Sequence, residues 1–546
     1  MPSNAEAAET FRTIADLLDV LGERFKPEAY RRAARSIDSL TEDLAAVSAR
    51  GELRTVPGVG EAIEEKIREY LTTGRIDYLE RLRREVPPGV AELLRIPGIG
   101  PKSARRFWTE LGIEGPAELL AAIDARRLEG VQGFGPKKIA QVRRAVEAAR
   151  GSGPVARLPI EVAYPVAQRI VQSLRERAGA EQVVIAGSFR RGRETVGDLD
   201  ILVTSHDPTR AFDVFSALPE VREVRLRGGT KETVVLTNGL QVDVRVVEPA
   251  SFGAALQYFT GSKDHNVVVR TLAKDAGLRV NEYGVFRGEE RVAGTTEEEV
   301  YGALGLAWIP PELREGRGEV EAARKGPLPP LVEERDLRGD LHVHLPPGAG
   351  SAELDRLLGE ARRRGYAYVG VVSEGVSEEG KPFRLPDPLV VQAGKASTPR
   401  FRVFRVAEVD GPPAEGESAP VGVDLVVRRP TGRRPGPPEG GEDPRPPALV
   451  AHLGGGGTDA VPTVRVWIAY AAAVGAAVEV GPGSERLDST WARTAREQGV
   501  RLAVPTGLLS AEEDPTRPVA LAFARRAGAT VADVVNAGLA GPTRAK

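Results

Sequence analysis

Two predicted strands joined through a glycine turn, with an Asp-x-Asp pair opening the second, constrain this chain more than any other feature. Residues 183–186 form an apolar run typical of a buried strand, and Gly187-Ser188 begins a turn whose backbone N–H groups can face an anion. Residues 199–203 predict the second strand, whose alternation places Asp198 and Asp200 on one face. Carboxylates so close are unfavourable unless a cation neutralises them, which indicates a site for phosphate and a divalent ion.

A third acidic residue, Asp243, stands in the alternating run 241–245 and can join the pair from a neighbouring strand. Two ions about 3.5–4 Å apart would then activate a hydroxyl and stabilise a leaving pyrophosphate. An Asp-x-Asp alone is more often a surface turn. The preceding Gly-Ser, the positive charge of Arg190 and Arg191, and Asp243 together favour phosphoryl transfer instead.

Residues 258–270 indicate the substrate. Two aromatic residues precede a glycine turn, and Asn266 and Arg270 lie four positions apart on one helical face. This arrangement suits a nucleotide sugar and a base edge beside a template strand, whereas the segment alone would favour an aromatic core pair with a capped helix.

These two segments closely resemble the palm and thumb motifs of family X DNA polymerases. The resemblance implies that Asp198 and Asp200 bind two catalytic metal ions, Mg²⁺ or Mn²⁺, and that Asp243 binds the ion that activates the primer 3′-OH. It implies a nucleotide-binding set of Gly187, Ser188, Arg191, Gly197, Tyr258, Phe259, Gly261, Asn266 and Arg270. The chain departs from animal members at Gln241, where they often have an arginine that buttresses the third aspartate.

The N-terminal third carries an internal repeat of about 35–40 residues with the sequences Pro-Gly-Val-Gly, Pro-Gly-Ile-Gly and Gly-Phe-Gly-Pro. Each predicts a tight turn into a helix N-terminus that offers N–H groups to a DNA phosphate, as in helix-hairpin-helix motifs, rather than ordinary glycine-capped corners. The basic run 137–150 agrees with a DNA partner, although the whole chain has a formal charge of −2. The predicted DNA-binding residues are Lys26, Tyr30, Gly58, Gly60, Gly98, Gly100, Lys102, Gly133, Gly135 and Lys137, with monovalent cations expected at the turns.

Lys66 aligns with the Schiff-base lysine of family members that remove a 5′-deoxyribose phosphate, and Lys26 and Tyr30 match positions that bind the 5′-phosphate. The neighbourhood departs from the animal enzymes, since Ala62 replaces a second lysine and Phe25 replaces a histidine. Lyase activity and a solvated lysine therefore both stay open.

The last third opens with His342-Val-His344, which places two imidazoles on one strand face. It resembles the PHP domain that many bacterial family X enzymes carry as a metal-dependent 3′→5′ exonuclease, and the alternation of apolar strands and helices predicts an α/β barrel-like fold. The later ligand motifs are eroded, leaving Glu408 and His452 as further candidates. We expect a degenerate domain without exonuclease activity.

The chain has 546 residues, 41% of them hydrophobic, and no cysteine, which excludes disulfides and thiol catalysis. We predict a multidomain α+β protein that is monomeric and cytoplasmic or nucleoid-associated, with no membrane partner. The expected domains are a helical DNA-end-binding domain (1–90), a helix-hairpin-helix segment (91–154), a nucleotidyltransferase palm with a mixed sheet (155–250), a thumb (251–316), a linker (317–335) and a PHP-type domain (336–546).

The predicted function is a DNA-directed DNA polymerase that fills short gaps in gapped or nicked DNA with deoxynucleotides, in base excision repair or end joining and with repair proteins as further partners. Two alternatives remain open: a nucleotidyltransferase for a non-DNA substrate, and a non-catalytic DNA-binding scaffold.

Overall fold

The computed structural model falls into two compact units, Met1–Ala156 and Arg157–Lys546. It describes residues 4–38, 44–94, 96, 99–131, 133–135, 138–140, 142–143, 146, 157–346, 349–376, 382–384, 392, 395–398, 400–410, 424–429, 449–451, 461–483, 486–508 and 514–537. Within these ranges, no helix is both long and apolar enough to cross a membrane.

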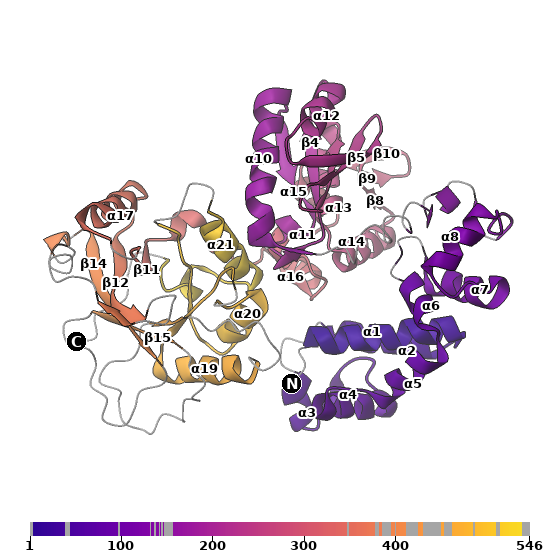
Figure 1. Ribbon diagram of the computed structural model, residues 1–546, viewed down its shortest axis with the longest axis horizontal. Helices are drawn as coiled ribbons and strands as arrows, with labels where there is room; N and C mark the ends of the chain where they lie inside the picture. The colour runs from indigo at the N-terminus through magenta and orange to yellow at the C-terminus, as the bar shows by residue number, and fades with distance from the viewer. Residues whose placement is uncertain are drawn as a thin grey trace. The chain divides into compact units, whose positions relative to one another are not determined.

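The first unit is helical, as predicted (Figure 1). Its elements are α1 (Asn4–Leu21), α2 (Lys26–Asp38), α3 (Leu44–Ala49), η1 (Leu53–Thr55), α4 (Glu61–Thr73), α5 (Asp77–Glu85), α6 (Pro88–Leu93), α7 (Pro101–Leu111) and α8 (Pro116–Asp124). Apolar residues at helical spacing, among them Phe11, Ile14 and Phe107, form one buried core.

The repeat turns of this unit share one backbone pattern. In each, the apolar residue between the two glycines donates its amide to the carbonyl three residues earlier, at 3.0 Å from Val59, 3.0 Å from Ile99 and 2.9 Å from Phe134. Gly60 and Gly100 are the N-caps of α4 and α7. Gly58 and Gly133 have φ of +86° and +88°, which favours glycine at these positions. The predicted positions Gly98 and Lys137 lie outside the described residues.

The palm is built on a five-stranded sheet in the order β2-β4-β7-β6-β5. Its elements are β1 (Leu158–Pro159), α10 (Ile160–Ala178), β2 (Gln182–Ile185), α11 (Gly187–Arg190), β3 (Thr195–Val196), β4 (Asp198–Thr204), α12 (Pro208–Ser216), β5 (Val221–Arg227), β6 (Lys231–Leu236) and β7 (Gln241–Val246). Strands β4 and β7 run parallel while the other pairs are antiparallel, so the sheet is mixed as predicted. Helices α10 and α12 share a core with this sheet.

The thumb follows directly. It comprises η2 (Pro249–Ser251), α13 (Phe252–Thr260), α14 (Lys263–Asp275), a small sheet of β8 (Arg279–Asn281), β9 (Gly284–Arg287) and β10 (Glu290–Ala293), then α15 (Glu297–Gly302) and η3 (Pro311–Leu313). Helix α16 (Glu319–Lys325) lies in the segment expected to be a linker. Phe252 and Leu256 of α13 pack against Leu202 of β4, which joins this segment to the five-stranded sheet.

The C-terminal domain is an α/β fold around a mainly parallel sheet. Its elements are η4 (Glu334–Asp336), β11 (Gly339–Val343), α17 (Ser351–Arg363), β12 (Tyr368–Val376), β13 (Pro382–Arg384), β14 (Arg402–Asp410), β15 (Leu425–Arg429), β16 (Leu449–Val450), α19 (Val461–Val474), β17 (Ala477–Glu479), α20 (Ser489–Glu497), β18 (Leu502–Ala503), α21 (Thr516–Arg526) and η5 (Val531–Asp533).

This sheet is nearly closed into a barrel. The strand order is β11-β12-β14-β15-β16-β17-β18, and the two end strands are tied together by side chains. Asn536 donates to the carbonyls of Gly339 and Val504, at 2.9 and 2.7 Å, and accepts from the amide of Val504. Asp340 likewise accepts from the amide and hydroxyl of Thr506, both at 2.7 Å. The predicted barrel-like fold is therefore confirmed.

Candidate active site

The three predicted acidic residues meet at the start of two neighbouring palm strands. The parallel register of β4 and β7 sets Asp200 opposite Asp243, and Asp198 opposite Gln241. Asp198 and Asp200 line an open pocket of about 600 Å³, whereas Asp243 is buried beside it. The alternation read from the sequence thus brings the carboxylates to one place.

The electrostatics of these carboxylates favour a bound cation. Burial, with the nearby charges of Asp198 and Asp243, raises the pKa of Asp200 to about 6. Burial and the charge of Asp243 also raise the pKa of Asp198. In addition, the buried Oδ1 of Asp243 has no hydrogen-bond partner among the described residues. Carboxylates that lie this close together repel one another unless a cation neutralises them. Divalent ions such as Mg²⁺ prefer oxygen ligands of this kind, so the residues fit the metal that the fold implies.

Two cations partly offset this negative charge from the side of the sheet. Lys231 on β6 places Nζ 2.5 Å from Oδ2 of Asp243, and Arg245 on β7 lies 3.6 Å from the same oxygen. Arg245 also approaches Asp200 at 4.0 Å and stacks over the ring of Phe259 at 4.3 Å. Lys231 and Arg245 therefore supply positive charge beside Asp243 although Gln241 stands at the position of the family arginine.

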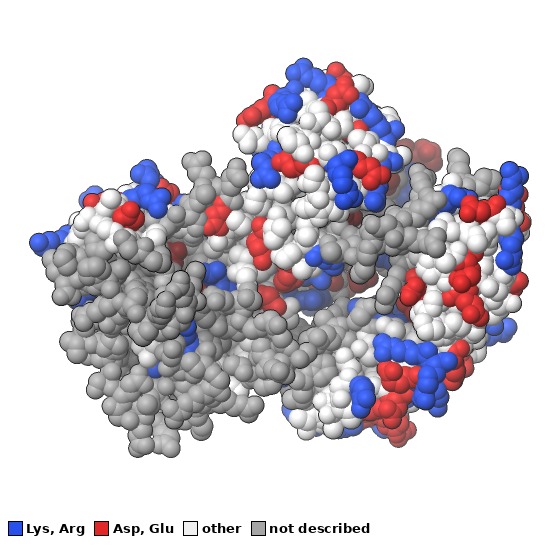
Figure 2. All heavy atoms as spheres, in the orientation of Figure 1, with Lys and Arg blue, Asp and Glu red and all other residues white. Residues whose placement is uncertain are grey.

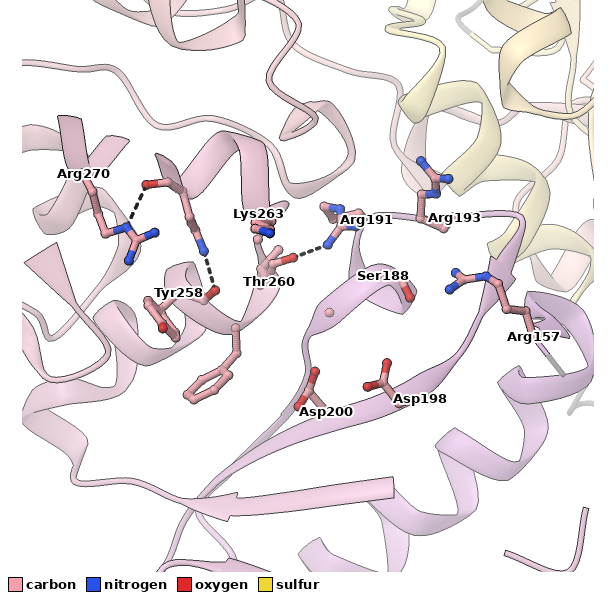
Figure 3. A pocket seen from close by; sticks show the side chains of 14 residues that line it. Arg157, Ser188, Arg191, Arg193, Asp198, Asp200, Tyr258, Thr260, Lys263 and Arg270 are labelled. Atoms are coloured by element: carbon pink, nitrogen blue, oxygen red, sulfur yellow. Dashed lines mark hydrogen bonds between the residues drawn. The ribbon is translucent and has the colours of Figure 1, made fainter. Parts of the chain in front are cut away.

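The opposite wall of the pocket is basic (Figure 3). Its glycine turn depends on Gly187, which has φ of +63° and where a Cβ would lie 3.2 Å from Oδ2 of Asp200. Arg191 is held by two contacts, from Nε to Glu315 at 2.9 Å and from Nη1 to the carbonyl of Thr260 at 2.5 Å. Ser188 also lines this wall, so hydroxyl and guanidinium donors face the carboxylates across the pocket.

The thumb residues complete the pocket. Tyr258 and Phe259 meet edge to face at 5.2 Å, and the Asn266 amide donates to the carbonyl of Tyr258 at 2.7 Å. The pocket is lined by Arg157, Gly187, Ser188, Arg191, Arg193, Asp198, Asp200, Tyr258, Phe259, Thr260, Gly261, Lys263, Asn266 and Arg270. The whole predicted nucleotide-binding set is among them except Gly197, which lies beside Arg157: a Cβ there would be 3.1 Å from its Nη1.

One prediction about this site is wrong. Arg190 does not add charge to the pocket, because it forms a two-point ion pair with Glu297 at 2.8 and 2.9 Å and donates to Thr260 Oγ1. Adjacent residues on a short helix point apart, so Arg190 links palm to thumb while Arg191 faces the pocket.

Sequence reasoning missed three cations of the pocket wall, Arg157, Arg193 and Lys263, and also Lys231. Arg157 precedes α10 and is held by Thr195 through contacts of 3.0 and 2.6 Å. No local motif marks it, because only the pairing of β1 with β3 brings it to Asp198. Lys231 opens strand β6, whose last three residues are apolar, but only the pairing of β6 with β7 brings it to Asp243.

In the N-terminal unit, Lys66 lies over the ring of Tyr78 at 5.0 Å and donates from Nζ to the carbonyl of Ala62 at 2.9 Å. Tyr30 is buried and stacks on Tyr78 at 6.1 Å, so Lys66 and Tyr30 both lie beside the Tyr78 ring. Lys26 is exposed and lies 3.3 Å from Glu23. The lyase role of Lys66 stays a prediction.

The negative charge of Glu64, a sequence neighbour of Lys66, is balanced by two arginines. Glu64 is bound to Arg54 at 2.6 Å and to Arg68 at 2.9 Å, and these hydrogen bonds lower its pKa.

The basic run 137–150 lies mostly outside the described residues. On the face shown in Figure 2, basic and acidic side chains are interspersed over the described surface.

In the C-terminal domain, His342, His344 and Glu408 form a cluster that could hold one metal ion, with ligand atoms within 4.8 Å of one another. Sequence analysis missed Glu479, a buried acid on β17 whose carboxylate lies 3.4 Å from Nδ1 of His342. Burial lowers the pKa of His342, but the charges of Glu479 and Glu408 and its hydrogen bonds to them outweigh this and raise it to about 9. The predicted ligand His452 lies outside the described residues.

Arginines reach the carboxylates of this cluster. Arg429 lies 3.7 Å from Oε2 of Glu408, and Arg486 lies 3.3 Å from Oε2 of Glu479. Guanidinium groups therefore approach the oxygens that further metal ions would need.

Comparison with known proteins agrees with the fold. Residues 2–76 match the helix-hairpin-helix domain, 90–148 the SAM-like helix-hairpin-helix tandem, 157–255 the DNA polymerase beta palm and 255–315 the DNA polymerase beta thumb. Fold and site thus define a DNA polymerase beta-type nucleotidyltransferase.

The chain is 32% identical over 411 residues to the DNA polymerase/3'-5' exonuclease PolX of Bacillus subtilis (strain 168), covering 73% of this chain and 70% of that protein. It is 29% identical to DNA polymerase lambda of Rattus norvegicus and 24% identical to that of Arabidopsis thaliana, covering 57% of this chain in both comparisons and 56% and 62% of those proteins. The chain belongs to the family X DNA polymerases and is a DNA-directed DNA polymerase.

Proposed function

We propose that this polymerase fills short gaps by joining a primer 3′-OH to a deoxynucleoside triphosphate at Asp198, Asp200 and Asp243, which would hold two Mg²⁺ or Mn²⁺ ions. The observation that carries the proposal is the register of Asp200 with Asp243 in a pocket whose other wall is basic. When bound, the ions would lower the pKa of the attacking hydroxyl and offset charge on the pyrophosphate.

The residues of the basic wall would hold the triphosphate. The turn of Gly187 and Ser188 offers backbone and hydroxyl donors, and Arg157, Arg191 and Arg193 offer guanidinium groups along the same wall. Because Glu315 and Thr260 hold the Arg191 guanidinium in place, its position is set before the substrate arrives, which lowers the entropy lost on binding.

The thumb residues would position the sugar and base. Tyr258 and Phe259 offer an aromatic wall to the deoxyribose, while Asn266 and Arg270 lie one helical turn apart where a base pair would end. The helix-hairpin-helix turns and Lys26 would bind the DNA backbone and the 5′-phosphate across the gap without reading sequence.

We also propose that the C-terminal domain is a degenerate PHP domain without exonuclease activity. The arginines beside Glu408 and Glu479 support this, because they place positive charge near carboxylates that a multi-metal centre needs. The test is Mn²⁺-dependent removal of 3′-nucleotides. We expect none above the level of His342→Ala, and loss of an activity in that variant would contradict the proposal.

Extension across a one-nucleotide gap with a 5′-phosphate tests the main proposal. We expect templated addition with Mg²⁺ or Mn²⁺ that Asp200→Ala abolishes while DNA binding persists. Nucleotide transfer only to a non-DNA acceptor, or DNA binding without any transfer, would refute the gap-filling role and favour one of the two alternatives.

A further inference from the structure

The C-terminal domain reaches the polymerase pocket through one buried arginine. Arg526, in the last turn of α21, is 3% exposed and donates from Nη1 to Oε1 of Glu315 at 2.6 Å. The same oxygen accepts from Nε of Arg191 at 2.9 Å. Nη1 of Arg526 also donates to the backbone carbonyl of Arg191 at 3.3 Å, so Arg526 contacts both the partner and the main chain of a pocket residue.

The turn that carries Arg191 is backed by the same helix. A Cβ at Gly192 would lie 3.0 Å from the Cβ of Ala522 on α21, and φ of +64° at Gly192 fits this close approach. Phe189, on the preceding helix α11, packs against the core of the C-terminal domain together with Tyr164, on which it stacks at 5.8 Å. The phosphate-facing turn therefore lies between the palm sheet and the C-terminal domain.

Removing Arg526 would remove two hydrogen bonds, one to the carboxylate of Glu315 and one to the backbone carbonyl of Arg191. Glu315 would then contact only Arg191 and Arg193 among the three arginines. Glu315 is almost fully buried, and hydrogen bonds between buried charged groups define side-chain orientation strongly. The Arg191 guanidinium would then be less well fixed toward the pocket, and substrate binding would carry the cost of ordering it.

We infer that Arg526 is a positioning residue for nucleotide binding, acting through Glu315 to hold Arg191 toward the triphosphate. The inference deepens the proposed function and rests on the role proposed there for Arg191. It gives the C-terminal domain a part in polymerisation that is independent of any metal in its own cluster.

Arg525 supplies a matched control on the same helix. It forms an equally short ion pair across the same domain contact, from Nε to Oε1 of Glu312 at 2.6 Å, and donates to the carbonyl of Val332. Among the contacts described for Arg525, none involves Arg191 or Glu315. Loss of Arg525 therefore weakens the domain contact without touching the turn.

The experiment is single-turnover filling of a one-nucleotide gap by the full chain, which separates the Kd of the incoming nucleotide from the maximal rate. We expect Arg526→Gln to raise that Kd about tenfold with little change in the Kd for gapped DNA, and Arg526→Lys to raise it less. Arg525→Gln should leave the nucleotide Kd unchanged. If Arg526→Gln does not fold, the nucleotide Kd of Arg526→Lys is compared with that of Arg525→Gln instead.

Equal shifts in Arg526→Gln and Arg525→Gln would overturn the inference, because the effect would then belong to the domain contact as a whole. An unchanged nucleotide Kd in Arg526→Gln would also overturn it. Arg191→Gln separates this failure from that of the proposed function. If Arg191→Gln leaves the Kd unchanged, the role of Arg191 is wrong; if it raises the Kd while Arg526→Gln does not, only the inference fails.

Discussion

Replacing Glu297 with glutamine should loosen the thumb. Glu297 is 5% exposed and accepts two hydrogen bonds from Arg314, at 2.5 and 3.0 Å, and two from Arg190, at 2.8 and 2.9 Å. Arg314 is completely buried. Removing the acid leaves a buried guanidinium without its counter-charge, a change that typically costs about 3–5 kcal/mol.

The pKa of Glu297 gives a second measure of the same effect. Burial raises this pKa, but the charge of Arg314 and hydrogen bonds from Arg190 and Arg314 outweigh it and lower the pKa from 4.5 to about 2. At roughly 1.4 kcal/mol per pKa unit, the ionised form contributes about 3 kcal/mol at neutral pH. The two figures agree in size.

Hydrogen exchange measured by mass spectrometry tests this prediction locally. Amides of α13 and α15 should exchange about a hundredfold faster in Glu297→Gln at pH 7. Glu298→Gln, an exposed neighbour on α15, is the control and should change exchange by less than threefold, since surface substitutions cost about 0.5 kcal/mol or less.

The pH dependence has a definite sign. Because the folded pKa of Glu297 is depressed, its stabilisation is complete above the unfolded value of 4.5 and is lost as pH falls toward about 2. After correction for intrinsic exchange rates, the difference between wild type and Glu297→Gln should therefore shrink across that window. A difference below about 1 kcal/mol at pH 7, or one that stays constant down to pH 2, would refute the reasoning.

Three further predictions concern the palm, the thumb and the barrel. Gly253→Ala should lower the thermal midpoint by several degrees, because its Cβ would lie 2.1 Å from the Thr296 backbone, whereas Gly302→Ala, with open space at the Cβ, should not. Lys231→Ala should move the acidic limb of the gap-filling rate to higher pH, because Lys231 lowers the raised pKa of Asp200; an unmoved limb would contradict this. Asn536→Ala should speed proteolysis of the C-terminal domain at least tenfold, since three buried hydrogen bonds are lost; unchanged cleavage would refute its role in closing the barrel.

The parts of the site that could be predicted from sequence are those determined by local geometry. Period-2 alternation placed Asp198 with Asp200, and a run of the same kind placed Asp243 on a strand whose register then brought it opposite Asp200. What could not be predicted depends on long-range pairing. Arg157 reaches the pocket only because β1 pairs with β3, and Arg190 was misread because its partner Glu297 lies 107 residues away.

The fold of the C-terminal domain could be predicted from the sequence, whereas its contact with the polymerase pocket could not. Alternating apolar strands and helices indicate an α/β barrel whatever its centre binds, since the core depends on pattern and volume. The contact of Arg526 with Glu315 joins residues 211 positions apart and leaves no trace in either local pattern. Long-range contacts of single polar side chains are therefore the information that only the structure adds.

The C-terminal cluster balances the charge of its buried carboxylates with positive side chains of the barrel itself. Buried Glu408 and Glu479 would repel each other strongly if ionised without counter-charge, which in a metal centre the ions supply. Here His342 lies between the Oε1 atoms of the two carboxylates, while Arg429 and Arg486 approach their Oε2 atoms, so the barrel interior contains positive charge of its own. This charge offsets part of the repulsion that metal ions would otherwise balance. Helix α21 contacts the nucleotide pocket through Arg526, so we expect its support of Arg191 to be the same whether or not the cluster binds an ion.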